Sequence, residues 1–358
     1  MATSVGKKGN LITIKPYQNE QVIINGGLSG GSYLHFEDLI ITDNAFTDRS
    51  AANSNDGIQV NEGNEYYYCT VKNHNQGFSA GSGKNNYKIH GCNVLYNGWD
   101  SQLGHGLYCQ HDNNNGIALF TGIIAHHNLG FGFHLWSASL VHRSMTLQRN
   151  ISFLNGDIRG ATKRDILVGT QQGIENIVLE NNRTYSTGES VMLGWGTGNS
   201  WANVQARSNV FAGITALRLN EAVLAETTVT DNALYGGLEP ATIADDYPSN
   251  TFDTLANLPD SYYLDALEDP NRANLTIYNP SQANTVVVDV SPLDWNSGTV
   301  NAKNSMDELV DIQTLEITNG TITVNMQAIN RTVETPVGWT APATTFPRFG
   351  CMRLEKVT

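Results

Sequence analysis

Charged side chains are scarce in this 358-residue chain, at 15% of its residues, and basic ones are in the minority. Lysine and arginine total 21 against 34 aspartates and glutamates, which gives a formal net charge of −13. Such a surface repels phosphate, so the composition argues against binding to nucleic acid or to anionic membranes. The low charge, with abundant glycine, asparagine and threonine, also differs from helical bundles. An all-β protein fits better.

Long hydrophobic runs and a recognisable leader are missing too. No stretch approaches the roughly 20 apolar residues that a membrane helix requires. Near the N-terminus, Leu11–Ile14 is followed at once by Lys15 and Pro16, which is too short an apolar run for a signal peptide. We therefore predict no signal peptide and no membrane insertion. An extracellular or virion-associated protein of this kind has either lost its leader or is released by lysis.

Cysteines are few and scattered. The four are Cys69, Cys92, Cys109 and Cys351. They show neither CxxC spacing nor a histidine at zinc-finger distance, so we predict no metal site and no cofactor. Calcium is the one alternative, held by Asp56, Asp100 or Asp112, although their spacing has no strong calcium signature.

A short strand motif recurs about every 25 residues through the first two-thirds of the chain. The copies are Gly57-Ile-Gln-Val-Asn, Gly77-Phe-Ser-Ala-Gly, Gly106-Leu-Tyr-Cys-Gln, Gly132-Phe-His-Leu-Trp, Asp165-Ile-Leu-Val-Gly, Ser190-Val-Met-Leu-Gly and Ala216-Leu-Arg-Leu-Asn. This period with strand alternation predicts the coils of a parallel β-solenoid. The inward residues are Ile58 and Val60, Phe78 and Ala80, Leu107 and Cys109, Phe133 and Leu135, Ile166 and Val168, Val191 and Leu193, and Leu217 and Leu219.

A second column tests the first. The strand that closes each coil aligns Cys69, Cys92, Gly122, Asn150, Asn182, Asn209 and Asn232. The four asparagines predict a ladder in which each amide bonds the coils above and below. Cys69 and Cys92 are expected to stack on adjacent coils as free thiols, because a chain without a leader folds in a reducing cytosol.

The repeat weakens after Gly237, which divides the chain into three regions. We predict a parallel β-helix over residues 1–237, an irregular connector over residues 238–267 and a small antiparallel β-sandwich over residues 268–358. Prolines interrupt the connector, and the strand-like segments beyond it no longer follow the spacing of about 25 residues. Asn319-Gly320 predicts a hairpin turn between two of these strands.

An ordered succession of motifs covers the coils: Gly91–Trp99, Gly104–Gln110, Gly130–Trp136, Asn150–Gly156, Asp165–Gly169 and Asn182–Tyr185. It resembles the right-handed parallel β-helix repeat proteins of the pectin-lyase-like superfamily, and Arg272–Asn279 resembles the start of their C-terminal β-domain. The resemblance covers most of the chain. It implies a right-handed β-helix in a family of predicted secreted proteins without an assigned reaction.

Outward residues of the strand motif are Gln59, Ser79, Tyr108, His134, Leu167, Met192 and Arg218. They predict a patch over coils 57–136 that engages a polysaccharide, because CH faces of sugars stack on Trp or Tyr while hydroxyls bond amides. The substrate-binding candidates are Asp56, Gln59, Asn61, Gln110 and Trp136. The alternative is that exposed solenoid faces are polar without any ligand.

Whether this patch also cleaves its ligand is left open. In a polysaccharide lyase, His105, His134 or Tyr108 would abstract the proton beside a uronate carboxylate, and Arg164 would neutralise that carboxylate. All nine histidines precede residue 143, which locates acid-base chemistry in the first half. A glycoside hydrolase is disfavoured, because the adjacent aspartates Asp245-Asp246 lie in the connector.

A non-catalytic structural or adhesive function is the second hypothesis. Leu11–Ile14 and Gln21–Ile24 are expected to form the first coil, and no amphipathic helix precedes them as a lid. Open strand edges invite pairing. We therefore predict a homo-oligomer, or docking on a partner through the N-terminal end, as would suit a decoration or tail protein on a virion surface.

Overall fold

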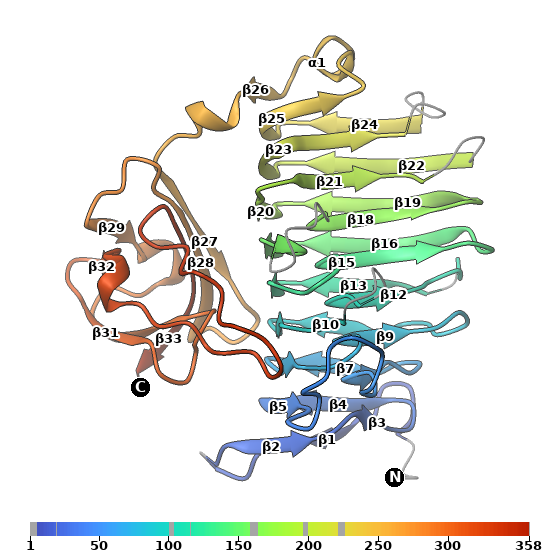
Figure 1. Cartoon of the computed structure of the whole chain (residues 1–358), viewed down its shortest axis with the longest axis horizontal. Coiled ribbons are helices and arrows are strands. Elements are labelled where there is room, and N and C mark those ends of the chain that lie inside the picture. Colours follow the sequence, from blue (N-terminus) through green and yellow to red (C-terminus); the bar gives the residue numbers. More distant parts are fainter. Residues whose placement is uncertain are drawn as a thin grey trace. The chain divides into compact units, whose positions relative to one another are not determined.

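The computed structural model describes residues 6–18, 20–99, 104–114, 116–157, 164–195, 200–220 and 226–357. It confirms an all-β fold, a right-handed parallel β-helix followed along the chain by a small antiparallel β-sandwich (Figure 1). Residues 1–256 and 337–339 form one compact unit, and residues 257–336 and 340–358 form the other. None of the helices in the described ranges is long and apolar enough to cross a membrane.

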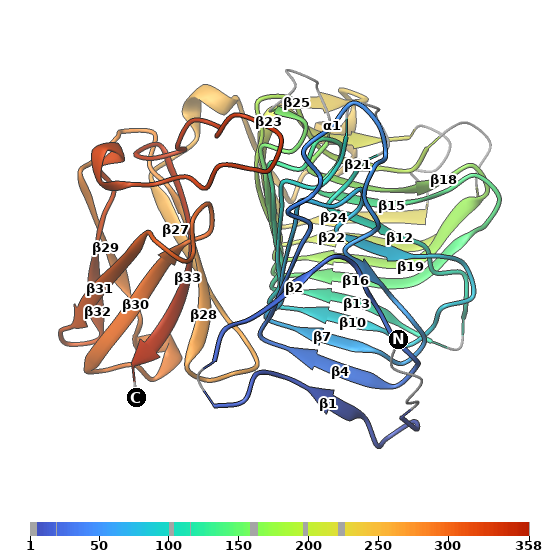
Figure 2. The same cartoon turned by 60° about the horizontal axis from the view of Figure 1, so that its bottom comes forward.

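Three columns of parallel strands build the β-helix (Figure 2). The first is β1 (Ile12–Ile14), β4 (Leu34–Glu37), β7 (Glu65–Tyr67), β10 (Lys88–His90), β13 (Ala118–Thr121), β16 (His142–Gln148), β19 (Gly173–Glu180), β22 (Ser200–Arg207) and β24 (Thr227–Thr230). The second is β2 (Val22–Asn25), β5 (Leu39–Thr42), β8 (Thr70–Lys72), β11 (Asn93–Leu95), β14 (Ile124–His126), β17 (Ile151–Phe153) and β20 (Arg183–Tyr185). The third is β3 (Leu28–Ser29), β6 (Ile58–Gln59), β9 (Phe78–Ala80), β12 (Leu107–Cys109), β15 (Phe133–Ser137), β18 (Ile166–Thr170) and β21 (Glu189–Leu193).

The second and third columns merge at their C-terminal end. There β23 (Val210–Leu219) pairs with both β20 and β21. Next, β25 (Ala233–Glu239) pairs with β23, and β26 (Thr251–Asp253) pairs with β25. The solenoid therefore continues past residue 237, where the sequence predicts its end.

The core follows the predicted alternation. All fourteen residues predicted to face inward are at most 2% exposed and belong to one hydrophobic cluster. The strand register pairs Ile58 with Phe78, Phe78 with Leu107, and Leu107 with Phe133. Stacking coils about 4.8 Å apart buries apolar side chains against their counterparts above and below, so no covering helix is needed along the stack.

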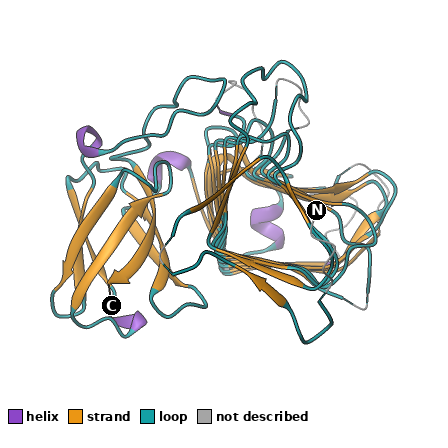
Figure 3. Ribbon diagram, turned by 90° about the horizontal axis from the view of Figure 1, so that it is seen from below, coloured by secondary structure: helices purple, strands orange, loops and turns teal. Residues whose placement is uncertain are grey.

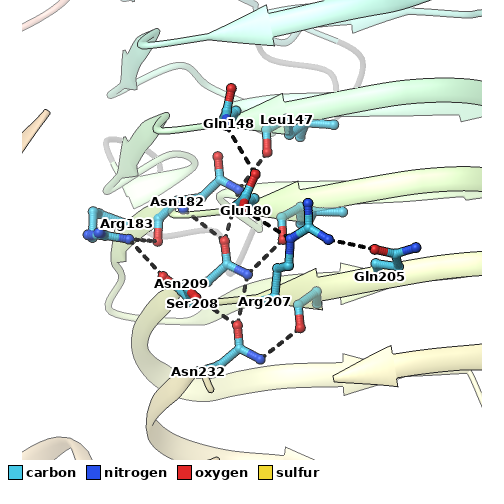
Figure 4. Close-up of polar contacts among 12 residues, drawn as sticks. Leu147, Gln148, Glu180, Asn182, Arg183, Gln205, Arg207, Ser208, Asn209 and Asn232 are labelled. Carbon is cyan, nitrogen blue, oxygen red and sulfur yellow. Dashed lines mark hydrogen bonds and ion pairs between the residues drawn. The ribbon is translucent and has the colours of Figure 1, made fainter. Parts of the chain in front are cut away.

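The predicted asparagine ladder is confirmed (Figure 4). Each side-chain amide donates to the carbonyl oxygen of the next asparagine, from Asn150 to Asn182 and from Asn182 to Asn209 at 2.9 Å, and from Asn209 to Asn232 at 2.8 Å. The ladder is one residue longer than predicted, because Asn232 donates to Asn250 at 2.8 Å.

One position of the predicted column is wrong. The register aligns Cys69 with Cys92 and places Ile123, not Gly122, beside them, and the backbone amide of Ile123 donates to Asn150 Oδ1 at 3.0 Å. Gly122 forms the preceding turn at φ 60°. Cys69 and Cys92 stack on adjacent coils as predicted, and all four cysteines are free and buried.

A second polar ladder, which the sequence analysis missed, lies at another turn of the coil. Asn97 Nδ2 donates to Asn128 Oδ1 at 3.0 Å, Asn128 to Asn155 at 2.9 Å, and Asn155 to Asp165 Oδ1 at 2.8 Å. All four side chains are buried. Burial raises the pKa of Asp165 well above its usual range, which favours the neutral acid at the end of a row of neutral amides.

A short helix lies at the C-terminal end of the solenoid. Ile243 of α1 (Ile243–Asp246) is fully buried in the solenoid core, and Figure 3 shows a short helix within the outline of the stacked strands. The prediction of an irregular connector over residues 238–267 is therefore wrong. These residues contain α1, β26, η3 (Leu255–Asn257) and β27 (Ser261–Ala266), and their first part belongs to the β-helix unit.

The second unit contains two antiparallel sheets. The five-stranded sheet has the order β27, β28 (Arg272–Tyr278), β33 (Phe349–Val357), β30 (Gly298–Asn304) and β31 (Ile312–Ile317). The smaller sheet pairs β29 (Thr285–Asp289) with β32 (Thr321–Asn325), and the connections include η4 (Ser291–Leu293) and η5 (Ala328–Asn330). Asn319 and Gly320 make the predicted two-residue hairpin turn at φ 52° and 74°, which an antiparallel bridge between Thr318 and Thr321 closes. Beyond this bridge, β31 and β32 pair in different sheets.

Candidate functional site

The outer face of the third column carries most of the predicted site. The register pairs Tyr108 with His134, His134 with Leu167, Leu167 with Met192 and Met192 with Arg218, as the sequence predicts. Adjacent strands lie about 4.8 Å apart, so side chains of neighbouring coils are in contact range along this face. Alternation along each strand turns these residues outward while their neighbours fill the core.

Aromatic rings gather on this face. The ring of His134 stacks on Phe131 at 4.5 Å and 14°, and on Trp136 at 5.8 Å and 8°. The ring centroid of Tyr108 lies 5.4 Å from that of His134. Trp136 and Trp195 pack against the buried cluster of Phe131, Leu167 and Met192. We name Tyr108, Phe131, His134, Trp136 and Trp195 the aromatic patch. Phe131 is buried beneath it, whereas the other four are half-buried.

His105 supports the aromatic patch from below. Its ring lies 4.1 Å from that of His134, and its side chain is only 1% exposed. Its Nδ1 accepts a hydrogen bond from the backbone amide of Phe131 at 3.1 Å, which places the proton of the neutral ring on Nε2. The structure therefore places His105 with His134 and Tyr108, as predicted, but as an enclosed ring with one nitrogen already engaged.

A chain of ion pairs borders the aromatic patch. Arg164 Nε lies 2.5 Å from Glu189 Oε2, Arg218 Nη2 lies 2.9 Å from Glu189 Oε1, and Arg218 also pairs with Glu239. The guanidinium of Arg164 lies 5.7 Å from the Trp195 ring. Burial lowers the pKa of Arg164, and the charge of Glu189 opposes this shift. Arg164 thus reaches the predicted site already neutralised by a carboxylate.

Two of the predicted substrate contacts lie apart from this centre. Gln59 pairs in register with Ser79, and Ser79 pairs with Tyr108, so a full coil separates Gln59 from the aromatic patch. Asp56 precedes the same strand as Gln59. Burial raises the pKa of Asp56, and a hydrogen bond with Ser79 opposes the shift. Asp56 and Gln59 therefore lie on a neighbouring part of the solenoid surface, outside the aromatic patch.

The two predicted amide contacts differ from each other. The Gln110 amide donates to the hydroxyl of Tyr108 and to the backbone carbonyl of Trp136, both at 3.3 Å. It therefore lies within the aromatic patch. Asn61 instead accepts a hydrogen bond from Lys84 Nζ at 2.9 Å, on the coil of Gln59.

Metal ligands do not cluster in the part of the chain that the structure describes, where no group of three or more His, Cys, Asp or Glu side chains could hold an ion. Of the calcium candidates, Asp112 accepts a hydrogen bond from the backbone amide of Gly83 at 3.2 Å. Asp100 lies outside the described residues. Calcium binding stays a prediction.

Sequence reasoning missed part of this surface. Trp195 and Glu189 come from coils beyond the predicted limit at residue 136, yet they contact Arg164. The sequence contained a signal for these residues, because the predicted column of outward residues continues without interruption to Arg218. Extending the patch by three coils would have included these side chains.

No family model and no curated protein matches this chain. Among solved structures it is similar to the Dettilon tailspike protein, at 11% identity and a TM-score of 0.37 over 93% of this chain and 74% of that one. It is also similar to a tailspike protein of the Acinetobacter baumannii bacteriophage Fri1, a capsular polysaccharide depolymerase, at 12% identity and 0.34 over 94% and 66%. A mannuronic acid-specific polysaccharide family 6 lyase from human gut microbiota aligns at 14% identity and 0.26 over 72% and 82%. Likenesses this distant carry no argument about activity, and the predicted superfamily stays a prediction.

Proposed function

We propose that the β-helix unit binds an uncharged polysaccharide through the aromatic patch. The observation that carries this proposal is the stack of Phe131, His134 and Trp136, in which the ring planes differ by 14° between Phe131 and His134 and by 8° between His134 and Trp136. The exposed edges and faces of such a stack form an apolar platform for the CH faces of sugar rings. The Gln110 amide beside Trp136 supplies a polar group for hydroxyls.

The bordering charges favour an uncharged chain. Arg164 and Arg218 both pair with Glu189, and Arg218 also pairs with Glu239. A uronate carboxylate would have to displace these partners, and it would be repelled by the carboxylates of Glu189 and Glu239. The excess of 34 acidic over 21 basic residues opposes a polyanion further.

Cleavage of the bound chain is a narrower proposal. His134 and Tyr108 are half-buried on the outer face, so either can reach a ligand proton. His105 is enclosed, so its contribution would be to hold His134 in place. Because Arg164 is engaged by Glu189, the residue set supports binding better than it supports uronate elimination.

Affinity electrophoresis through gels that contain mannan, dextran, galactan or xylan tests this function. Trp136→Ala should abolish the retardation that the wild-type chain shows in at least one gel. Tyr17→Ala is the matched control, because it removes an aromatic ring that is 71% exposed in the first coil. Absence of retardation in every gel, or equal retardation of Trp136→Ala, would contradict the proposal.

Product analysis of the same mixtures distinguishes an enzyme from a binding protein. New reducing ends without unsaturation would indicate a hydrolase. A lyase needs a uronate carboxylate beside the proton that it abstracts, so unsaturated products are sought in parallel mixtures with polygalacturonate. We expect any products to disappear in Tyr108→Phe and in His134→Ala. Retardation without products of either kind would assign the chain to non-catalytic binding.

A structural function, as part of an assembly, is the second candidate. At the N-terminal end of the solenoid, β1 pairs only with β4 and β2 only with β5 among the described residues. Ile12 and Ile23 on these strands are 42% and 53% exposed. Such an edge favours a second copy of the chain or a docking partner, on a virion or outside the cell. Light scattering of the eluted chain tests this, and a monomer of 39.0 kDa at high concentration would count against it.

A further inference from the structure

A second surface of the β-helix carries a groove of about 490 Å³, lined by Asn86, Asn114, Ile117, Ser144, Thr146 and Asn176 together with one glycine. It belongs to strands β16 and β19 of the first column and to the turns that lead into β10 and β13. The aromatic patch lies instead on the third column. The groove is therefore a separate surface with its own chemistry.

A left-handed backbone position recurs in this column on four of five coils and shapes the groove. The register places Asn86 beside Ile117, Ile117 beside Ser144, and Ser144 beside Asn176, and Asn203 continues the column. Asn86, Ser144 and Asn176 each have φ of 54°, and Asn203 has φ of 53°. Asparagine tolerates this left-handed conformation better than most residues. This recurring left-handed position interrupts the strand alternation and presents a row of polar side chains on the outer face.

The lining offers hydrogen bonds without charge. Its asparagine amides and its hydroxyls both donate and accept, and Ile117 adds an apolar surface that is 57% exposed. Arg143 and Glu175, next in sequence to the lining residues Ser144 and Asn176, bond each other through Nε at 2.8 Å and Nη2 at 3.4 Å. An ionic ligand would find no unmatched charge in that pair.

We propose that this groove binds a short neutral oligosaccharide, at a site independent of the aromatic patch. Hydroxyl groups match the amides and hydroxyls of the lining, and a sugar CH face matches Ile117. The volume falls within the range of small-molecule sites. Gly116 keeps the wall open, because a side chain there would meet Asn86 Oδ1 at 3.0 Å.

The test follows the δ1-methyl NMR signal of Ile117, assigned by Ile117→Val, in the full chain. The probes are the neutral trisaccharides maltotriose, cellotriose, mannotriose and chitotriose, with trigalacturonate as the charged comparison. The variant combines Asn86→Gly with Asn176→Gly, because glycine adopts positive φ freely and both side chains are exposed. It therefore removes two of the three lining amides without straining the turns.

We expect at least one neutral trisaccharide to shift the Ile117 signal at millimolar concentration. The double variant should weaken that binding about tenfold while its melting temperature stays unchanged. Trp136→Ala should leave the Ile117 shift intact, so failure at the aromatic patch and failure at the groove are separate results. An Ile117 signal that no neutral sugar moves, that only trigalacturonate moves, or that moves equally in the double variant would overturn the proposal.

Discussion

The interior and the exterior of the β-helix follow opposite patterns. Inside, one ladder repeats a single residue type on successive coils, at Asn150, Asn182, Asn209, Asn232 and Asn250. Outside, the column that crosses the aromatic patch holds a different residue type at every position, Gln59, Ser79, Tyr108, His134, Leu167, Met192 and Arg218. Both columns have the same spacing between coils.

The difference comes from what each side chain contacts. In the interior, every side chain contacts the equivalent residue of the coils above and below. A residue type whose hydrogen bonds are satisfied by such neighbours in one coil is therefore favoured in the next coil as well. On the exterior, water covers one side, and repetition brings no comparable gain. Periodicity therefore reports the fold, and its interruption on the outer face marks where a ligand can determine the residue type.

The largest loss of folding stability is expected on lowering the pH, because several histidines are buried in the interior. Burial lowers the pKa of His74 to about 4 and of His142 to about 3, and it holds the pKa of His127 well below its usual range. Unfolding lets each ring take up a proton near pH 6.5, so stability is full above that pH and falls as the pH drops toward the folded values. Each histidine should cost roughly 2 kcal/mol at pH 5. Urea unfolding between pH 7 and pH 5 measures the loss.

His142→Leu sharpens that test. Among the described residues, neither ring nitrogen of His142 has a hydrogen-bond partner, so an apolar side chain of similar size should be tolerated. The variant should lose about one proton from the pH dependence of unfolding. An unchanged dependence in His142→Leu would contradict the assignment of a buried neutral histidine.

Breaking the asparagine ladder should cost the next most. Asn182→Leu removes the donor to the carbonyls of Leu147 and Asn209 and the acceptor for the backbone and side-chain amides of Asn150. Several buried groups then lack partners, which should destabilise the fold by about 3 kcal/mol or more. Chemical denaturation measures the loss. The exposed Asn55→Leu is the control, and equal stability of the two variants would refute the ladder's contribution.

A smaller and opposite effect is expected at the second ladder. Because burial raises the pKa of Asp165, the unfolded chain loses its proton near pH 4 while the folded chain keeps it. Stability therefore falls as the pH rises above 4, up to the folded pKa. Asp165→Asn should raise the melting temperature at pH 7 by a few degrees and change little below pH 4. A lower melting temperature at pH 7 would show that the carboxyl is needed.

The sequence predicts the interior well because each coil repeats the same alternation. It places all seven strand motifs and four ladder asparagines correctly. The errors occur where the spacing of the repeat is irregular. Gly122 lies one residue before the position that joins the ladder column. Asn250 was missed because the segment before it contains prolines and does not match the strand motif. The second ladder went unseen because Asn97 and Asn128 lie in turns outside the strand motif.

The candidate site is only partly visible in the sequence. The register places Tyr108, His134 and Trp136 on one face, but it does not reveal that Arg164 is neutralised by Glu189. That pairing depends on side-chain conformations across coils. The groove is harder to predict, because its shape depends on left-handed backbone positions whose residue type changes along the column from Asn86 to Ser144 and Asn176.

The outer face should show the smallest effect on folding and the largest effect on binding. Trp136 is half-buried, so Trp136→Ala should leave the chain folded with a melting temperature within a few degrees of the wild type. The loss should appear instead in the affinity for sugar. Trp136→Phe keeps an aromatic ring and should restore most of that affinity.

The dissociation constant of the tightest-binding neutral oligosaccharide, measured by calorimetry for the wild type, Trp136→Ala and Trp136→Phe, tests this account most directly. Trp136→Ala should bind at least about tenfold more weakly, equivalent to about 1.4 kcal/mol, and Trp136→Phe should bind almost as tightly as the wild type. Equal dissociation constants for all three folded proteins would contradict this account.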